Sequence, residues 1–172
     1  GISVTILDLP SQEGSRNQIA VNAKEKILKS RPPLLVENNK IDLISTGNIQ
    51  DDFNLVGDAD WVVEAVVERI DIKHNIYKKI EEVRKENCII SSNTSTIPLK
   101  VLSEKMSEEM KKIFCITHFY NPVRYMGLLE IVIEPINVKE KIDILKSFCD
   151  EKLGKGVIIC KDTPGFLGNR VG

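Results

Sequence analysis

The sequence predicts an α/β fold with a mostly parallel sheet, and two observations support this. Apolar runs of strand length alternate with amphipathic segments of helical period along most of the chain. Parallel strands need crossovers between them, so this alternation is typical of α/β domains. Two of the runs, residues 112–119 and 127–133, are instead joined by a short turn, which predicts an added antiparallel strand.

The first part of the chain predicts two strands around one helix. Residues 2–8, "ISVTILD", form a β-branched apolar run, which is the composition of a strand. Residues 15–30 carry apolar side chains on one helical face, and the two prolines of "RPPLL" stop that helix. A short second strand is predicted at residues 40–45, "KIDLIS".

The middle part predicts two strands and two helices. "WVVEAVV" at 61–67 is a strong strand, and residues 71–86 have isoleucines at helical spacing. "CIISS" at 88–92 is the next strand, and Pro98 is well placed to begin a short helix at 98–105.

The last part completes the sheet. The strands at 112–119 and 127–133 come first. A helix at 138–152 follows, and Gly154 just past its end is a stop signal. "GVIICKD" at 156–162 predicts the last strand, and a turn-rich tail comes after it.

Composition restricts the classes of function. The chain has 172 residues, with 42% hydrophobic and 28% charged, which suits one globular domain. Its 24 basic and 25 acidic residues leave no electrostatic footprint for nucleic acid, and no apolar run approaches the length of a membrane span. The four scattered cysteines contain no Cys-x-x-Cys pair, so we expect reduced core thiols in a cytoplasmic protein and no metal site.

Polar residues recur where the predicted strands end. Asp8, Glu68, the stretch 92–95 and His118 each follow an apolar run. Ligands of parallel α/β sheets bind at the carboxyl ends of the strands. Any one of these residues could simply form a turn or cap a helix, but together they predict a binding site along one edge of the sheet.

Asp8 has the character of a ribose-binding residue. In dinucleotide-binding folds an acid at the end of the second strand accepts hydrogen bonds from the adenosine ribose. The same folds place a G-x-G-x-x-G turn before it, and the ten glycines of this sequence never fall in that spacing. If 2–8 is the second strand, we expect a sheet that is incomplete at its N-terminal side and lacks the pyrophosphate site.

Glu130 poses a question because it lies in the apolar run "GLLEIVI". A buried carboxylate is unfavourable unless it is paired and hydrogen-bonded. One possibility is an edge strand with Glu130 facing water. The alternative is that neighbouring strands bring it against His118, where it would fix the imidazole tautomer and raise its basicity for general base catalysis. His74, amid the lysines of helix 71–86, is interpreted as a solvated surface residue.

Four blocks of the sequence resemble one family. "ADWVVEAVVERIDIKHNIYKKI", "SSNTSTIPL", "THFYNPVRYMGLLEIV" and "CKDTPGFLGNR" are similar, in order and spacing, to the signature blocks of the NAD-binding domain of L-3-hydroxyacyl-CoA dehydrogenases. The resemblance covers essentially the whole chain and implies a Rossmann-like sheet. The form of these blocks in this sequence is similar to that of the bacterial branch. In that branch the domain is followed by others in a longer, multidomain fatty-acid oxidation protein.

The resemblance implies oxidation of an L-3-hydroxyacyl-CoA to a 3-ketoacyl-CoA with NAD, a step of fatty-acid β-oxidation. The implied catalytic residues are His118 as base, Glu130 as its partner, Ser95 at the substrate oxygen and nicotinamide, and Asn169 at the substrate carbonyl. The implied cofactor-binding residues are Asp8, Glu68, Lys73, Ser95 and Asn121.

The family also has a glycine-rich loop before the position of Asp8 and a helical dimerisation domain after "GNR", and this sequence contains neither. We therefore expect residues 1–172 to form a truncated NAD-binding domain, weak or inactive by itself, that assembles as a homo-oligomer through unpaired strand edges. The alternative is a non-catalytic remnant or interaction fragment. Related β-hydroxyacid dehydrogenases that use a catalytic lysine are a third possibility, against which the His118 and Glu130 pattern argues.

Overall fold

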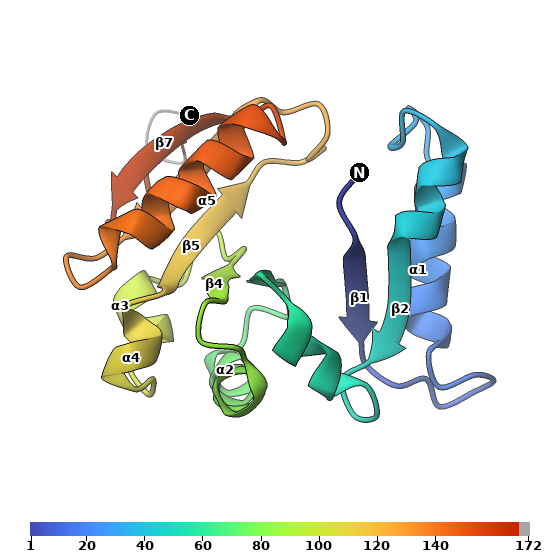
Figure 1. Ribbon diagram of the computed structural model, residues 1–172, viewed down its shortest axis with the longest axis horizontal. Coiled ribbons are helices and arrows are strands. Elements are labelled where there is room, and N and C mark those ends of the chain that lie inside the picture. The colour runs from blue at the N-terminus through green and yellow to red at the C-terminus, as the bar shows by residue number, and fades with distance from the viewer. Residues whose placement is uncertain (169–172) are drawn as a thin grey trace. The chain divides into compact units, whose positions relative to one another are not determined.

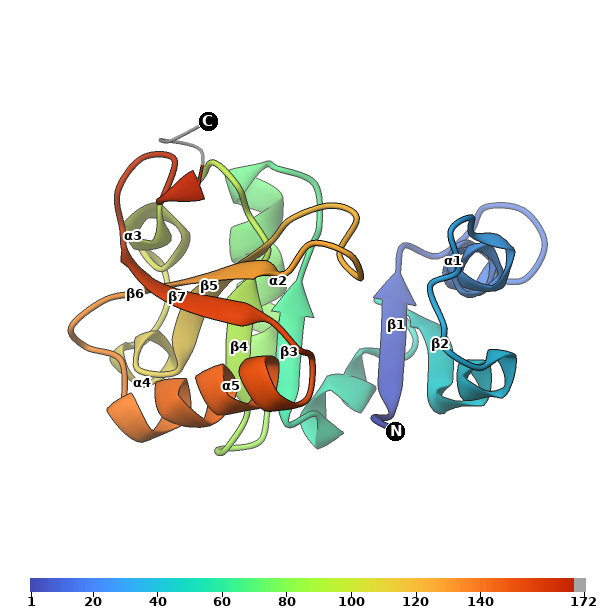
Figure 2. The ribbon, with the colours of Figure 1, turned by 90° about the horizontal axis from the view of Figure 1, so that it is seen from above.

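The computed structural model describes residues 1–168 and divides the chain into two compact units. Residues 1–56 form the first unit, and the described residues from 57 onward belong to the second. Figures 1 and 2 together label their helices and strands. Among the described residues, no helix is both long enough and apolar enough to cross a membrane.

The first unit is a parallel β-α-β arrangement. Strand β1 (Val4–Asp8) pairs with β2 (Ile44–Asn48), and helix α1 (Gln18–Lys29) connects them. The predicted strand at 40–45 is therefore placed too early, because a 3-10 helix occupies Asn38–Leu43. The polar segment "NNK" at its start favours a turn-like conformation over a strand.

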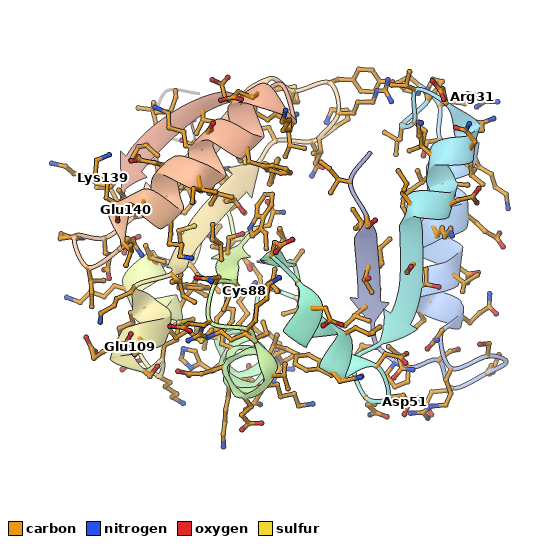
Figure 3. The ribbon with its side chains drawn as sticks, viewed as in Figure 1. Arg31, Asp51, Cys88, Glu109, Lys139 and Glu140 are labelled. Carbon is orange, nitrogen blue, oxygen red and sulfur yellow. The ribbon has the colours of Figure 1, made fainter. Side chains whose placement is uncertain are left out.

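A polar turn closes β2. Asn48 is 1% exposed, and its Oδ1 accepts hydrogen bonds from the amides of Gln50 and Asp51. Figure 3 labels Asp51, whose carboxylate also binds the Arg16 guanidinium. That hydrogen bond from Arg16 lowers the pKa of Asp51 below its ordinary value.

The second unit contains a five-stranded sheet in the order β3-β4-β5-β6-β7. Strands β3, β4 and β5 are parallel, β6 is antiparallel to β5, and β7 is parallel to β6. The predicted mostly parallel sheet with an antiparallel addition is confirmed. The strands are β3 (Trp61–Glu64), β4 (Ile89–Ser92), β5 (Phe114–Phe119), β6 (Leu128–Ile133) and β7 (Gly156–Lys161).

Strand β3 ends three residues earlier than the sequence predicts. The amide of Val66 donates to Oε1 of Glu64 at 2.7 Å, so the side chain of Glu64 takes the hydrogen bond that a continuing ladder would use. The chain turns there and enters helix α2 (Ile70–Val83). This early turn brings Glu68 back toward the carboxyl end of β4, where it contacts the stretch 94–96.

Helices α2 and α5 (Lys139–Glu151) cover opposite faces of this sheet, as Figures 1 and 2 show. Neighbouring residues of a strand point to opposite faces. Phe114 of β5 makes an edge-on ring contact with Tyr77 of α2, whereas Cys115 belongs to the apolar cluster that includes Leu145 and Cys149 of α5. His118, an even number of residues from Phe114, therefore lies on the α2 face.

The four cysteines are buried and free, as the sequence predicts for core thiols. Figure 3 labels Cys88, which directly precedes β4. Burial raises the pKa of the Cys115 thiol to about 12. These thiols therefore act as small apolar packing groups at neutral pH.

Two short helices complete the second unit. Helix α3 (Leu99–Leu102) is shorter than predicted, and α4 (Glu108–Lys111) is not predicted by apolar periodicity, since it spans one turn. Ser107 caps α4 by accepting a hydrogen bond from the amide of Met110. The cap of α3 comes from far along the chain: Asp162, just after β7, accepts from the amides of Leu99 at 2.9 Å and Lys100 at 3.0 Å.

Asp162→Ala removes this cap. We expect the free energy of unfolding of the second unit to fall by about 1 kcal/mol, because two amides lose a charged acceptor. Urea unfolding followed by circular dichroism measures the loss. Asp150→Ala, at an exposed position near the end of α5, is the matched control and should change stability by less than about 0.5 kcal/mol. Equal effects of the two substitutions would contradict the capping role.

Candidate active site

His118 and Glu130 meet across the antiparallel strands β5 and β6. They are partners in the strand register, so their side chains share one face. Nδ1 of His118 lies 2.8 Å from Oε2 of Glu130, and the carboxylate is fully buried. The predicted contact is present, and the alternative in which Glu130 faces water is wrong.

Glu130 is surrounded by hydrogen-bond donors. Its Oε1 accepts from the amides of Leu167 and Gly168, each at 2.8 Å. Its Oε2 accepts from the Tyr120 hydroxyl at 2.7 Å in addition to His118. Burial alone would raise the pKa of Glu130, but the hydrogen bonds from His118, Gly168, Tyr120 and Leu167 outweigh it and hold this pKa below the ordinary value.

An ionised Glu130 fixes the roles of the two imidazole nitrogens. A carboxylate with no proton of its own accepts only, so Nδ1 of His118 carries the hydrogen of this bond. In the neutral imidazole, Nε2 is then the ring nitrogen with a lone pair, which is the state that a general base requires. The His118 side chain is 9% exposed, and its ring lies near those of Tyr120 and Phe166, with centroid distances of 4.6 Å and 5.6 Å.

The turn after β7 positions the amides of Leu167 and Gly168 to donate to Glu130. Its sequence "TPGF" places Gly165 at a φ of 77° and Phe166 at a φ of 48°, both in the left-handed region. For phenylalanine that region is strained, and the strain is offset by the buried ring and by the hydrogen bonds that the turn makes possible. The amide of Phe166 donates to the carbonyl of Thr163 at 2.9 Å and closes the turn.

A polar hollow of about 320 Å³ opens beside His118. This volume is at the lower end of the range for small-molecule sites. Two residues that the sequence singled out, Ser95 and Asn121, line it together with the histidine. The complete lining is Asn93, Ser95, His118, Phe119, Tyr120 and Asn121. Asn93 is held in place because its Oδ1 accepts from the amide of Phe119 at 3.1 Å.

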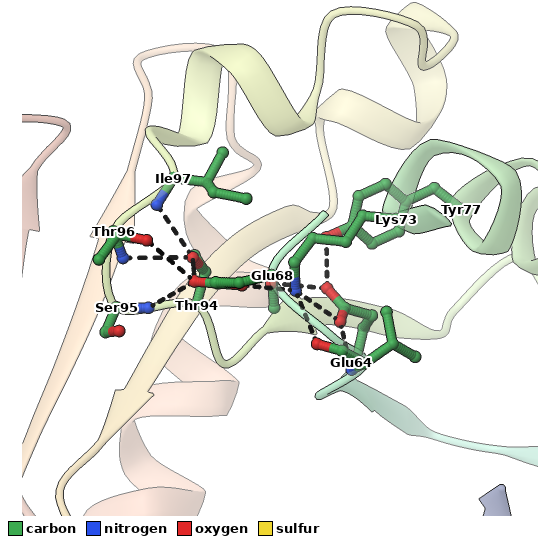
Figure 4. A network of polar contacts seen from close by, with 10 residues as sticks. Glu64, Glu68, Lys73, Tyr77, Thr94, Ser95, Thr96 and Ile97 are labelled. Carbon is green, nitrogen blue, oxygen red and sulfur yellow. Dashed lines mark hydrogen bonds and ion pairs between the residues drawn. The ribbon is translucent and has the colours of Figure 1, made fainter. Parts of the chain in front are cut away.

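A second buried cluster, drawn in Figure 4, joins β3, α2 and the end of β4. The ammonium of Lys73 lies 2.8 Å from Oε1 of Glu64 and 3.0 Å from Oε2 of Glu68. Glu64 also accepts from Ser92 Oγ at 2.7 Å and from Tyr77 Oη at 2.5 Å. Every oxygen of this buried carboxylate is thus paired, as burial of a charge requires.

Glu68 links this cluster to residues 94–96, of which Ser95 lines the hollow. Its Oε1 accepts from Thr94 Oγ1, from Thr96 Oγ1 at 3.2 Å and from the amide of Ser95 at 3.3 Å. Burial raises the pKa of Glu68, but the hydrogen bonds from Thr94 and Lys73 outweigh it and lower the pKa overall. The cluster therefore fixes the turn that presents Ser95.

The predicted site residues have different outcomes. The second unit brings together His118, Glu130, Ser95 and Asn121. Lys73 is 1% exposed and paired with two carboxylates, so the structure gives it a positioning role, and a direct cofactor contact remains a prediction. Asp8 ends β1 in the first unit, with its Oδ1 accepting from the amide of Leu9, and its role likewise remains a prediction. Asn169 lies outside the described residues.

Four residues that contribute to the site were not predicted from the sequence. Tyr120 stands two residues after His118, so the two-residue period of a strand could have placed both on one face. Glu64 lies inside an apolar run, the same signal that drew attention to Glu130. The amides of Leu167 and Gly168 leave no sequence signal beyond the turn composition of "TPGF", because every residue except proline carries an amide.

Lys73→Met leaves Glu64 and Glu68 without their shared cation. We expect a loss of about 3 kcal/mol in the free energy of unfolding, because removing one partner of a buried ion pair leaves an uncompensated charge. The matched control is Lys78→Met, an exposed position on the same helix, with an expected change below about 0.5 kcal/mol. Chemical denaturation measures the free energy of unfolding of both variants. A Lys73 variant as stable as wild type would refute the structural role.

The pKa shift of Glu130 predicts sensitivity to acid. A carboxyl group whose pKa is lower in the folded state contributes stability that is complete above its unfolded pKa of about 4.3 and disappears as the pH falls through the folded value. Glu130→Gln should therefore lower stability at pH 7 and flatten the loss of stability below about pH 4. Urea unfolding over this pH range tests this, with exposed Glu104→Gln as control. An unchanged slope in acid would contradict the assignment.

Comparison with known proteins agrees with this geometry. A family model described as "3-hydroxyacyl-CoA dehydrogenase, NAD binding domain" matches residues 1–163. A putative fatty acid oxidation complex trifunctional enzyme of Rickettsia felis is 44% identical over 98% of this chain and 24% of its own length. A probable 3-hydroxyacyl-CoA dehydrogenase of Deinococcus radiodurans is 40% identical over 100% of this chain and 50% of its own length. The chain thus spans half or less of these two relatives.

Solved structures agree as well. The crystal structure of M. tuberculosis FadB2 has a TM-score of 0.83 at 26% identity, covering 99% of this chain and 59% of that one. (S)-3-hydroxybutyryl-CoA dehydrogenase PaaH1 from Ralstonia eutropha has a TM-score of 0.75 at 28% identity, covering 98% and 58%. The resemblance read from the sequence blocks is confirmed: the chain belongs to the 3-hydroxyacyl-CoA dehydrogenase family and corresponds to its NAD-binding domain.

Proposed function

We propose that this chain is the NAD-binding part of an enzyme that oxidises L-3-hydroxyacyl-CoA to 3-ketoacyl-CoA in fatty-acid β-oxidation. The observation that carries the proposal is the His118–Glu130 pair beside the polar hollow that Ser95 and Asn121 line. An alcohol loses a proton and a hydride in such an oxidation. The pair supplies an oriented base for the proton.

The hollow has the chemistry that a nicotinamide needs. Its amide and hydroxyl side chains, Asn93, Ser95 and Asn121, can donate and accept, which matches a carboxamide that does both. NAD supplies the acceptor of the hydride when it is bound. Ser95 and Asn121 would hold its nicotinamide end, Asp8 its adenosine ribose, and Glu68 and Lys73 would support the site through the turn at 94–96.

His118 then acts on the substrate alcohol. Its Nε2 takes the proton of the 3-hydroxyl group, and the ionised Glu130 stabilises the imidazolium that results. Ser95 orients the same oxygen by a hydrogen bond, and Asn169 would hold the carbonyl of the thioester. In the reverse direction the imidazolium returns the proton to the ketone oxygen.

We further propose that residues 1–172 form the NAD-binding domain of a longer, bacterial and cytoplasmic enzyme. A glycine-rich phosphate segment and a helical substrate domain would be needed for full turnover, since hydride donor and acceptor must be held in a defined geometry. We infer that the assembled protein is a homo-oligomer and that neither nucleic acid nor a membrane is a partner. The competing proposal is a non-catalytic remnant that keeps the fold.

His118→Asn tests the catalytic proposal. In the chain joined to a glycine-rich phosphate segment and a helical substrate domain of the family, reduction of acetoacetyl-CoA, followed by the loss of NADH absorbance, should fall by about two orders of magnitude or more because the general acid–base group is lost. His74→Asn makes the same change on helix α2, where Nε2 of the imidazole lies 3.0 Å from the carbonyl oxygen of Val101, and should leave the rate unchanged.

Calorimetric titration with NAD separates loss of binding from loss of chemistry. We expect both histidine variants to bind NAD like the wild-type chain. If the wild-type chain neither binds NAD nor reduces acetoacetyl-CoA, alone or joined to a glycine-rich phosphate segment and a helical substrate domain, the non-catalytic alternative is correct. Equal rates for His118→Asn and wild type would remove His118 from the reaction.

A further inference from the structure

Tyr120 competes with His118 for one atom. The Tyr120 hydroxyl donates to Oε2 of Glu130 at 2.7 Å, and Nδ1 of His118 approaches the same oxygen at 2.8 Å. The other oxygen, Oε1, is occupied by the two amides of the turn after β7. The two side chains therefore share a single acceptor, and their rings lie 4.6 Å apart.

The structure leaves space for this hydroxyl at a neighbouring glycine. A Cβ atom on residue 168 would lie 1.8 Å from Oη of Tyr120 and 2.8 Å from its Cζ, so a side chain there could not coexist with the tyrosine in this position. The amide of the same Gly168 donates to Oε1 of Glu130. Hydroxyl, glycine and carboxylate thus form one close-packed group.

Tyr120 remains a donor across the working pH range. Burial, followed by the hydrogen bond to Glu130, raises the pKa of its hydroxyl to about 12. Among residues 1–168, the titratable groups at this carboxylate besides His118 are Tyr120, directly after β5, and Cys160 from β7, whose Sγ lies 3.9 Å from Oε1. The pKa of Cys160 is raised by burial, so at neutral pH its thiol is uncharged.

We propose that Tyr120 is a positioning residue that sets the strength of the hydrogen bond between His118 and Glu130 by sharing its acceptor oxygen. This deepens the proposed function, on which it rests for its catalytic meaning. A second donor on one oxygen withdraws electron density from that oxygen and weakens the bond that the first donor makes. Tyr120 therefore weakens the hydrogen bond that Nδ1 of His118 donates to Glu130.

Tyr120→Phe removes the hydroxyl and keeps the ring. In proton NMR spectra of the isotope-labelled chain, the Nδ1 proton of His118 should move downfield, because Oε2 then serves one donor and its bond to the imidazole shortens. In carbon-13 titration, the pKa of Glu130 should rise, by up to about one unit, because one of its hydrogen bonds is lost. Neither readout requires turnover.

Tyr77→Phe is the matched control, since it removes a tyrosine hydroxyl from the other buried carboxylate, Glu64, and should leave the His118 and Glu130 signals unchanged. An unmoved or upfield-shifted Nδ1 proton in Tyr120→Phe overturns the proposal. Glu130→Gln distinguishes failure of the acceptor-sharing proposal from failure of the proposed function. If it displaces the His118 signals while Tyr120→Phe does not, the pair stands and only the sharing fails; if neither displaces them, the pair and the proposed function fail together.

Discussion

The second unit depends on one buried carboxylate, Glu130, that is ionised without contact with solvent. A charge in that position must be surrounded by donors, and no single element of the fold can supply them. Strand β5 supplies His118, Tyr120 directly after it supplies its hydroxyl, and the turn after β7 supplies two amides. The requirement to satisfy Glu130 therefore holds three parts of the chain together, and the orientation of the imidazole is a consequence of that requirement.

The cluster around Glu64 and Lys73 follows the same rule with a different result. Here a buried carboxylate is balanced by a buried ammonium, and a second acid, Glu68, uses the same ammonium at the surface. Because Glu68 also accepts from the stretch 94–96, the charges of this cluster fix the turn that carries Ser95. One cluster orients the base, the other orients a residue beside it, and both belong to the same sheet edge.

The sequence is sufficient for the order of the strands and of the longer helices, and for the His118–Glu130 contact, since two strands joined by a short turn place their residues opposite one another. It is insufficient where a side chain replaces a backbone partner. The end of β3 at Glu64 follows from a carboxylate that captures the Val66 amide, and the α3 cap comes from Asp162, 63 residues away. The burial of Lys73 is invisible to periodicity, which assigns lysine to the solvated face of a helix.

The central claim is that an ionised Glu130 holds the proton of His118 on Nδ1 and leaves Nε2 as the acceptor. Nitrogen-15 NMR of the labelled chain, recorded at a pH high enough for a neutral imidazole, reports which ring nitrogen is protonated. We expect a protonated Nδ1 and an unprotonated Nε2. A signal from an imidazole protonated mainly on Nε2 would contradict it.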